Sequence, residues 1–192
     1  MKKIIFISAL VAGVGIMCLT ACRSKKPLAK ETGATEVTVP LSGREYNSDK
    51  EFFRTKSSGK SPDLTTAKKI ALVNAKAEMA GLIKATLKRV TDNYTNQRSV
   101  GDRQEYANKF EEMTREVVNQ QLVDVKIIGE KIFKEANNSF TYWIAIETSK
   151  DDILNGIHNG ISKNEKLQLD YDKMKFEEKF NEEMNKLEND RP

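Results

Sequence analysis

The feature that most constrains this chain is a long helical run from Ser61 to about Tyr94. Apolar residues recur there at the spacing of one helix face, at Leu64, Ala67, Ala71, Ala75, Met79, Leu82, Ile83, Leu87, Val90 and Tyr94. The run predicts a helix of roughly 30 residues, or about 45 Å, with the other elements packed beside it. Ser61 and Pro62 have the residue types of an N-cap and of a first helical position. The alanines of the seam allow a sheet or another helix to approach closely.

A second helix is predicted between Asp102 and about Gln121. Asp102 and Glu105 have the spacing of a capping box. The apolar residues that follow form one helix face, at Tyr106, Phe110, Met113 and Val117. This helix is therefore expected to pack on the same core as the long one.

Strand patterns lie on both sides of the two helices. Phe52–Ser57 reads as a short strand, and Leu122–Lys134 is rich in branched residues, with Gly129 as a candidate bulge. Asn137-Asn138 is a turn signal, and Phe140–Glu147 alternates so that Tyr142, Ile144 and Ile146 share a face. The predicted fold is α+β in two layers. A small antiparallel sheet, made of one N-terminal strand and a hairpin, packs on the long helix.

The C-terminal part predicts further helices. Ser149 is placed to cap a short helix that carries Ile153, Ile157 and Ile161. Leu167, Leu169 and Tyr171 alternate, which indicates an extended link. A last helix follows, with a stripe at Phe176, Phe180, Met184 and Leu187 and a charged opposite face.

The N-terminus resembles a bacterial lipoprotein signal. Lys2-Lys3 precede the apolar segment Ile4–Leu19, which is shorter than the about 20 residues that a membrane-spanning helix needs. The segment ends in Leu19-Thr20-Ala21-Cys22, which has the form of a lipobox. Cys22 is therefore predicted to carry lipid and to become the mature N-terminus. Arg23 favours the outer membrane over retention at the inner one, with the domain facing the periplasm.

The predicted organisation has four parts. Residues 1–21 are the signal peptide, and 22–50 are a lipid-anchored flexible tether, in which Val37–Val39 could add a short edge strand. Residues 51–161 form the α+β domain, and 162–192 form a C-terminal extension with the charged amphipathic helix.

Composition argues against several classes of function. Loss of Lys2 and Lys3 with the signal lowers the formal net charge of +4 by two, and no basic stripe with interleaved aromatic residues suggests nucleic acid as a partner. The two cysteines are Cys18, inside the signal, and Cys22. A mature chain without a free thiol and with His158 as its one histidine is expected to hold no metal and no cofactor. His158 is interpreted as a surface or partly packed residue, because the sequence does not indicate a nucleophile and a carboxylate that would form a catalytic triad with it.

The local sequences Ser58–Ser61, Ala67–Ala71, Ala75–Ala80 and Tyr142–Ile146 resemble the Lpp-twenty family of small bacterial outer-membrane lipoproteins. The resemblance covers about Phe52 to Glu147 and rests on a pattern of small and apolar residues. It implies a lipid-anchored envelope protein, and the family has related domains near the flagellar base. It brings no catalytic residues to this chain.

Two hypotheses on function remain open at this point. The first is a non-enzymatic lipoprotein that binds or scaffolds unknown envelope proteins. Its candidate contacts are Trp143, on the strand face opposite Tyr142, and Phe176 with Phe180. The general rule that an apolar helical stripe faces a core favours the other interpretation of this stripe, a helix docked on its own domain. The second is a small-ligand-binding protein or enzyme with a cleft between helix and sheet.

Overall fold

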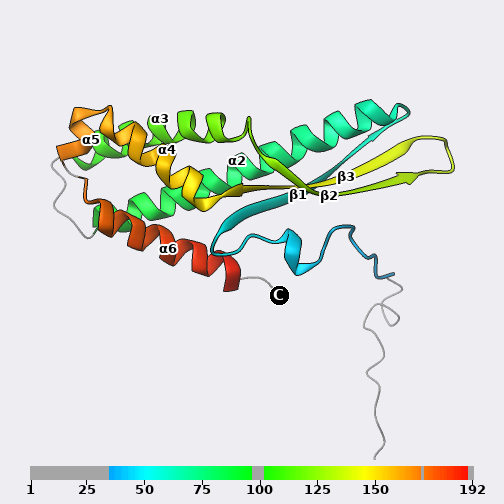
Figure 1. Cartoon of the computed structure of the whole chain (residues 1–192), viewed down its shortest axis with the longest axis horizontal. Helices are drawn as coiled ribbons and strands as arrows, with labels where there is room; N and C mark the ends of the chain where they lie inside the picture. Colours follow the sequence, from blue (N-terminus) through cyan, green and yellow to red (C-terminus); the bar gives the residue numbers. More distant parts are fainter. Residues whose placement is uncertain (1–34, 97–101, 170, 190–192) are drawn as a thin grey trace, which may run out of the picture. The chain divides into compact units, whose positions relative to one another are not determined.

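In the computed structural model, the described residues are 35–96, 102–169 and 171–189. The predicted signal peptide and Cys22 lie outside them. Figure 1 shows the elements of the chain from Thr38 onward. In chain order they are η1 (Arg44–Tyr46), β1 (Phe52–Ser61), α2 (Leu64–Asn96), α3 (Arg103–Gln121), β2 (Lys126–Lys134), β3 (Phe140–Ser149), α4 (Lys150–Ser162), α5 (Glu165–Leu169) and α6 (Lys173–Asn189).

The predicted α+β fold is confirmed. The three strands form an antiparallel sheet in the order β1-β3-β2, so the hairpin strand β3 is central. The register shifts between Ile127 and Gly129, which is the bulge expected at this glycine. Asn138 closes the hairpin with a φ of 60°, a conformation that asparagine tolerates better than most residues.

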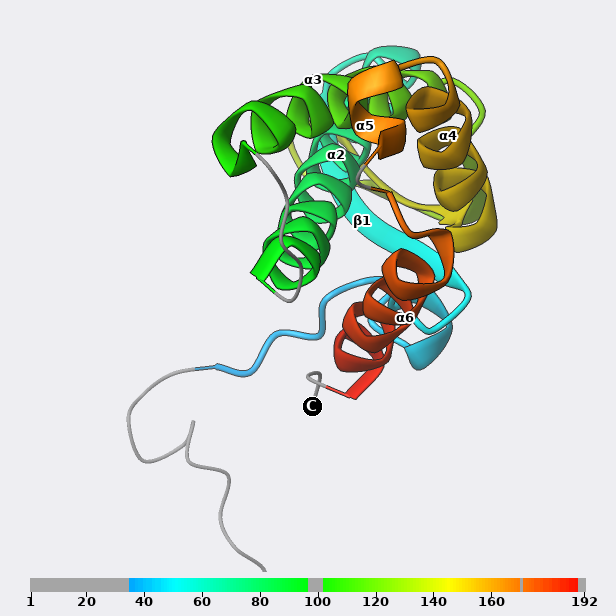
Figure 2. The same cartoon turned by 90° about the vertical axis from the view of Figure 1, so that its left-hand side faces the viewer.

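One face of α2 forms the core along its whole length. The first half of the helix packs on the inner face of the sheet with Ala67, Ala71, Ala75 and Met79, all fully buried. The Thr55 hydroxyl of β1 donates a hydrogen bond to the Ala75 carbonyl at 3.0 Å, which ties strand and helix together. The second half of α2 packs between α3 and α6 (Figure 2). A single helix thus joins the sheet layer to the helical layer.

The helix caps are partly as predicted. Asp102 accepts hydrogen bonds from the backbone N–H groups of Gln104 and Glu105, and Ser149 caps α4 in the same way. The predicted Ser61 cap of the long helix is wrong, because Ser61 is the last paired residue of β1. Asp63 takes its place and accepts a hydrogen bond from the Thr66 N–H at 2.7 Å.

The predicted domain boundaries differ from the observed ones at both ends. Leu41 and Ser48, placed in the tether by prediction, are buried, and the compact unit begins at Thr38. Residues 37–39 form no strand. At the other end, α6 is part of the main core rather than of an extension, because its apolar stripe is buried against β1, α2 and α3.

The link predicted as extended around Leu167 is the short helix α5. The Asn164 side chain accepts a hydrogen bond from the Leu167 N–H at 3.3 Å at its start. Leu167 is buried, whereas Leu169 is exposed to solvent. The alternation of apolar residues was therefore a misleading signal, because only Leu167 of this pair reaches the core.

A buried carboxylate, Glu183, joins α6 to α2. The residue is 2% exposed, and its carboxylate accepts hydrogen bonds from Arg89 Nε at 2.7 Å and from Lys186 Nζ at 2.6 Å. Burial raises the pKa of Glu183, but the hydrogen bonds from Lys186 and Arg89 outweigh burial and hold this pKa below its usual value of 4.5. The charged form is therefore favoured by folding.

This arrangement predicts a loss of stability in acid. Because the folded pKa of Glu183 lies below 4.5, the stability that the ion pairs contribute is complete above pH 4.5 and declines as the pH falls through the folded pKa. Glu183→Gln, which cannot ionise, is expected to be less stable than wild type at neutral pH. The difference in free energy of unfolding between the two proteins, called the gap below, should narrow below pH 4.5. Denaturant unfolding of both proteins across this range measures the gap, and a gap that stays constant would contradict the prediction.

Candidate interaction surface

The outer face of the sheet, away from α2, carries Trp143 at its centre. Trp143 pairs in register with Ser58 of β1 on one side and with Lys131 of β2 on the other. Tyr142 and Ile144, its neighbours in β3, are buried on the inner face. Trp143 itself is half-buried, so part of the indole remains accessible. The alternation predicted for β3 places this residue as expected.

The segment before β1 covers one part of this outer face. Leu41 and Tyr46 lie against Gly129, where an added Cβ atom would come within 2.6 Å of the Tyr46 ring. The absence of a side chain at Gly129 is therefore what makes room for this segment. Its cover ends near Lys131 and Phe133, where a hollow of about 320 Å³ opens between the segment and β2.

A charged network fixes the covering segment to the sheet. Arg54 lies between the carboxylates of Asp49 and Glu147, with its Nε 2.9 Å from Glu147 Oε2, and it also donates to the Asn47 carbonyl at 3.0 Å. Burial lowers the pKa of Arg54, but the hydrogen bonds to the two carboxylates outweigh it and raise this pKa above its ordinary value. Arg54 is therefore a structural cation that closes one end of the outer face.

The strand β2 is the open side of the sheet. Its apolar residues Ile132 and Phe133 are 51% and 45% exposed, and Ile127 is also accessible. Lys131 and Lys134 are exposed and form no ion pair within the described part of the chain. Exposed apolar side chains interleaved with lysines are thus presented along one edge.

The single acid of β2, Glu130, is already engaged. It accepts a hydrogen bond from the Tyr142 hydroxyl at 2.6 Å and pairs with Lys68 of α2 at 2.8 Å. The hydrogen bonds from Lys68 and Tyr142 hold the pKa of Glu130 below its usual value, so the carboxylate is ionised at neutral pH. Its negative charge is balanced by Lys68, and the β2 edge keeps a positive character from its lysines.

The second predicted contact, Phe176 with Phe180, is wrong as a surface. Both rings are 0% exposed. The Phe180 ring packs edge-on against Phe53 of β1 at 6.2 Å between centroids, and Phe176 packs against Phe110 at 5.5 Å. The amphipathic stripe of α6 therefore serves the core of its own domain.

His158 is on α4 and faces Tyr171 and the first turns of α6. Its ring is 6.0 Å from that of Tyr171, and its Nε2 is 3.6 Å from Glu177 Oε1, beyond hydrogen-bond distance. Burial and the nearby charge of Lys173 lower the pKa of His158, against a smaller opposing effect of Glu177. The imidazole is thus partly packed, as predicted from the sequence, and its surroundings favour its neutral form.

The interface of α2 with the sheet is closely packed at Gly59 and Thr55, where a cleft between helix and sheet was the alternative expectation. A groove of about 570 Å³ lies instead between α2 and α3. Lys84 and Arg115 line it, and the Thr114 hydroxyl there is buried without a hydrogen-bond partner among the described residues.

In the described ranges, no helix is both long and apolar enough to cross a membrane, and no group of three or more histidine, cysteine, aspartate or glutamate residues is arranged to hold a metal ion. Comparisons of the chain with models of known protein families, with curated proteins and with solved structures found no match. The likeness to the Lpp-twenty family stays a prediction.

The exposure of β2 is the feature that the sequence reasoning missed. The strand reads Lys-Ile-Ile-Gly-Glu-Lys-Ile-Phe-Lys, with lysines at both ends and in the middle. Lysines placed in this way are typical of an edge strand. That signal was present in the sequence, but it was not used to predict which strand lies at the edge of the sheet.

Proposed function

We propose that this protein is a lipid-anchored lipoprotein of a bacterial cell envelope that binds or scaffolds other envelope proteins and catalyses no reaction. The observation that carries the proposal is Leu19-Thr20-Ala21-Cys22, placed directly after a charged and apolar leader. Lipid on Cys22 holds the chain at the outer membrane, and Arg23 favours that membrane. The domain faces the periplasm.

The open side of the sheet supports a binding role. Trp143 is partly accessible on the outer face, and Phe133 is exposed on the same face of β2, whereas Ile132 pairs with Tyr142 and is exposed on the other face. Exposed apolar residues that cluster in this way are typical of protein contact sites, and tryptophan is enriched among residues that dominate binding energy. The proposed contact is therefore the outer face around Trp143 together with β2.

Replacement of Cys22 tests the anchor. Full-length wild type, Cys22→Ser and Cys18→Ser are expressed in bacteria and labelled with a palmitate analogue. Cys22→Ser is expected to lose the label and membrane attachment, because serine offers no thiol for the lipid. Cys18→Ser is the matched control, since Cys18 lies in the removed segment, and it should be labelled like wild type. Equal labelling of wild type and Cys22→Ser would refute the lipoprotein assignment.

Cross-linking in cells tests the contact. Trp143→Ala is compared with Val73→Ala. Val73 is an exposed apolar residue of α2, the helix that packs on the opposite, inner face of the sheet. Both variants must first be shown to fold by circular dichroism. Trp143→Ala is expected to recover less of the partner than Val73→Ala does. Equal recovery would place the contact elsewhere, and recovery of no partner by wild type would favour a small ligand in the groove between α2 and α3.

A further inference from the structure

The two edge strands of the sheet, β1 and β2, differ in the hydrogen bonds that the rest of the chain makes to their outward backbone groups. At the β1 edge, the Ser48 hydroxyl accepts a hydrogen bond from the Arg54 N–H at 2.9 Å and donates one to the Arg54 carbonyl at 3.1 Å. Asn74 of α2 donates to the Ser58 carbonyl at 2.9 Å. At the β2 edge, the described residues offer no such backbone bond outside the hairpin. The described chain thus engages part of the β1 edge and leaves the β2 edge open.

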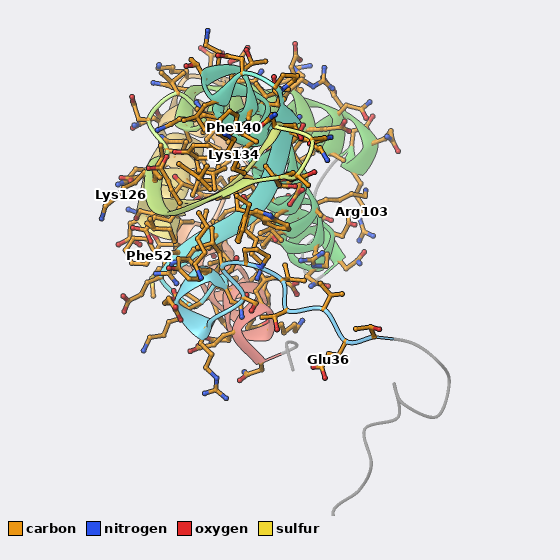
Figure 3. All side chains as sticks on the ribbon, turned by 90° about the vertical axis from the view of Figure 1, so that its right-hand side faces the viewer. Glu36, Phe52, Arg103, Lys126, Lys134 and Phe140 are labelled. Carbon is orange, nitrogen blue, oxygen red and sulfur yellow. The ribbon has the colours of Figure 1, made fainter. Side chains whose placement is uncertain are left out.

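The hairpin register shows which groups face the open edge. The Glu135 N–H donates to the Ser139 carbonyl at 2.9 Å, so the backbone of Glu135 is turned toward β3. Because this orientation alternates along an antiparallel strand, the N–H and C=O groups of Lys134, Ile132 and Glu130 point away from β3. These three residues present a ladder of free donors and acceptors. Figure 3 labels the two ends of the strand, Lys126 and Lys134.

Lysines and a bulge on an edge strand are known protections against self-association, and β2 carries both. Two β2 edges brought together would place Lys126, Lys131 and Lys134 of each copy near those of the other, and like charges repel. An acidic strand would meet the same lysines with attraction. The lysines therefore favour an acidic strand at this edge and disfavour the β2 strand of a second copy.

We propose that the open edge of β2 binds an extended, acidic segment of a partner protein, which adds to the sheet as a fourth strand. The free backbone groups of Glu130, Ile132 and Lys134 supply the hydrogen bonds. Lys131 and Lys134 supply the charge preference, and Phe133 supplies apolar contact. This inference rests on the proposed binding function and specifies the chemistry of the partner.

The test uses the full-length chain extracted from membranes and two labelled peptides of about ten residues, a usual strand length. One peptide alternates glutamate with valine, and the other alternates lysine with valine. Fluorescence anisotropy is expected to show binding of the glutamate peptide and not of the lysine peptide. Lys131→Glu combined with Lys134→Glu should reverse this preference, since both side chains are exposed and no ion pair of theirs is lost.

Ile132→Pro separates strand addition from simple charge attraction. Proline removes the outward N–H of residue 132 without removing a bond to β3, and edge strands tolerate proline at such positions. The affinity for the glutamate peptide is expected to fall by about tenfold or more, since a backbone hydrogen bond and the close approach of the strand are lost. Ile132→Val keeps the N–H and is the matched control, with binding near that of wild type.

A glutamate peptide with N-methylated valines keeps the test valid if Ile132→Pro fails to fold, because this peptide cannot donate to the edge and should not bind. Equal binding of methylated and unmethylated peptides, or no binding of the glutamate peptide, overturns the proposal. Sedimentation showing a wild-type dimer that Ile132→Pro makes monomeric overturns it in favour of a second copy. If the peptide binds this edge but Cys22→Ser is still labelled with lipid, the lipoprotein assignment fails and the edge site stands.

Discussion

Phe180→Ala is expected to lower the free energy of unfolding by about 3–5 kcal/mol, the usual cost of removing a fully buried phenylalanine ring. Phe180 is completely buried, and its ring packs edge-on against Phe53, which is itself buried in β1. The substitution leaves a cavity between α6 and the sheet. Because the apolar stripe of α6 holds this helix on the core, loss of the Phe180 ring weakens the attachment of the C-terminal helix. Denaturant unfolding monitored by circular dichroism measures the change.

Met174→Ala on the same helix is the control for this prediction. Met174 is 82% exposed, so its removal is expected to change the free energy of unfolding by less than about 0.5 kcal/mol. A Phe180→Ala protein as stable as Met174→Ala would show that α6 does not contribute to the core. The amphipathic stripe would then again be available as a partner surface.

Gly59→Val is the second substitution with a large expected effect, a loss of about 1–3 kcal/mol or more. A Cβ atom at Gly59 would lie 2.4 Å from the Ala67 carbonyl oxygen and 2.4 Å from the Ala71 nitrogen. Both are backbone atoms of α2, so no side-chain rotation relieves the clash. The helix and β1 would have to separate along the face where they now pack most closely. Thermal or denaturant unfolding measures the loss.

Gly81→Ala is the control, because it adds a side chain to a glycine of α2 where no close contact is made. A Cβ atom at Gly81, in the middle of α2, meets nothing within 4 Å. This substitution is expected to stabilise the protein by about 0.5–1 kcal/mol, because alanine loses less conformational freedom than glycine in a helix. If Gly59→Val lowers the free energy of unfolding and Gly81→Ala raises it, close backbone packing at Gly59 is supported. Equal small changes in the two variants would contradict it.

Local patterns in the sequence were sufficient for most of the fold. The long helix, the second helix with its Asp102 cap, the bulge at Gly129 and the turn at Asn138 follow from residue spacing and from the conformations these residues favour. The expected α+β class follows from the change of period between helical and strand segments. These are short-range properties, and a chain carries them whatever it packs against.

The candidate contacts show what local patterns leave open. The stripe of Phe176 and Phe180 fits a helix that packs on its own domain as well as one that binds a partner, because amphipathicity shows that a face is covered but not by what. The fold buries it against Phe53 and Phe110. Trp143 was placed on the correct strand face, but its half-buried state depends on neighbours that come from β1 and β2.

The sequence by itself determined most of the elements and their order, because helix and strand periods and caps depend on residues close together in the chain. The lipobox predicted at Cys22 is a local pattern of the same kind, and it stays a prediction. Only the tertiary structure decided that the segment with Leu41 and Tyr46 covers part of the outer face, that α6 completes the core, and that the β2 edge is left open. Each of these depends on contacts between residues far apart in the chain. Leu41 with Gly129, Phe53 with Phe180, and Asn74 with Ser58 are such pairs, and no local pattern specifies them.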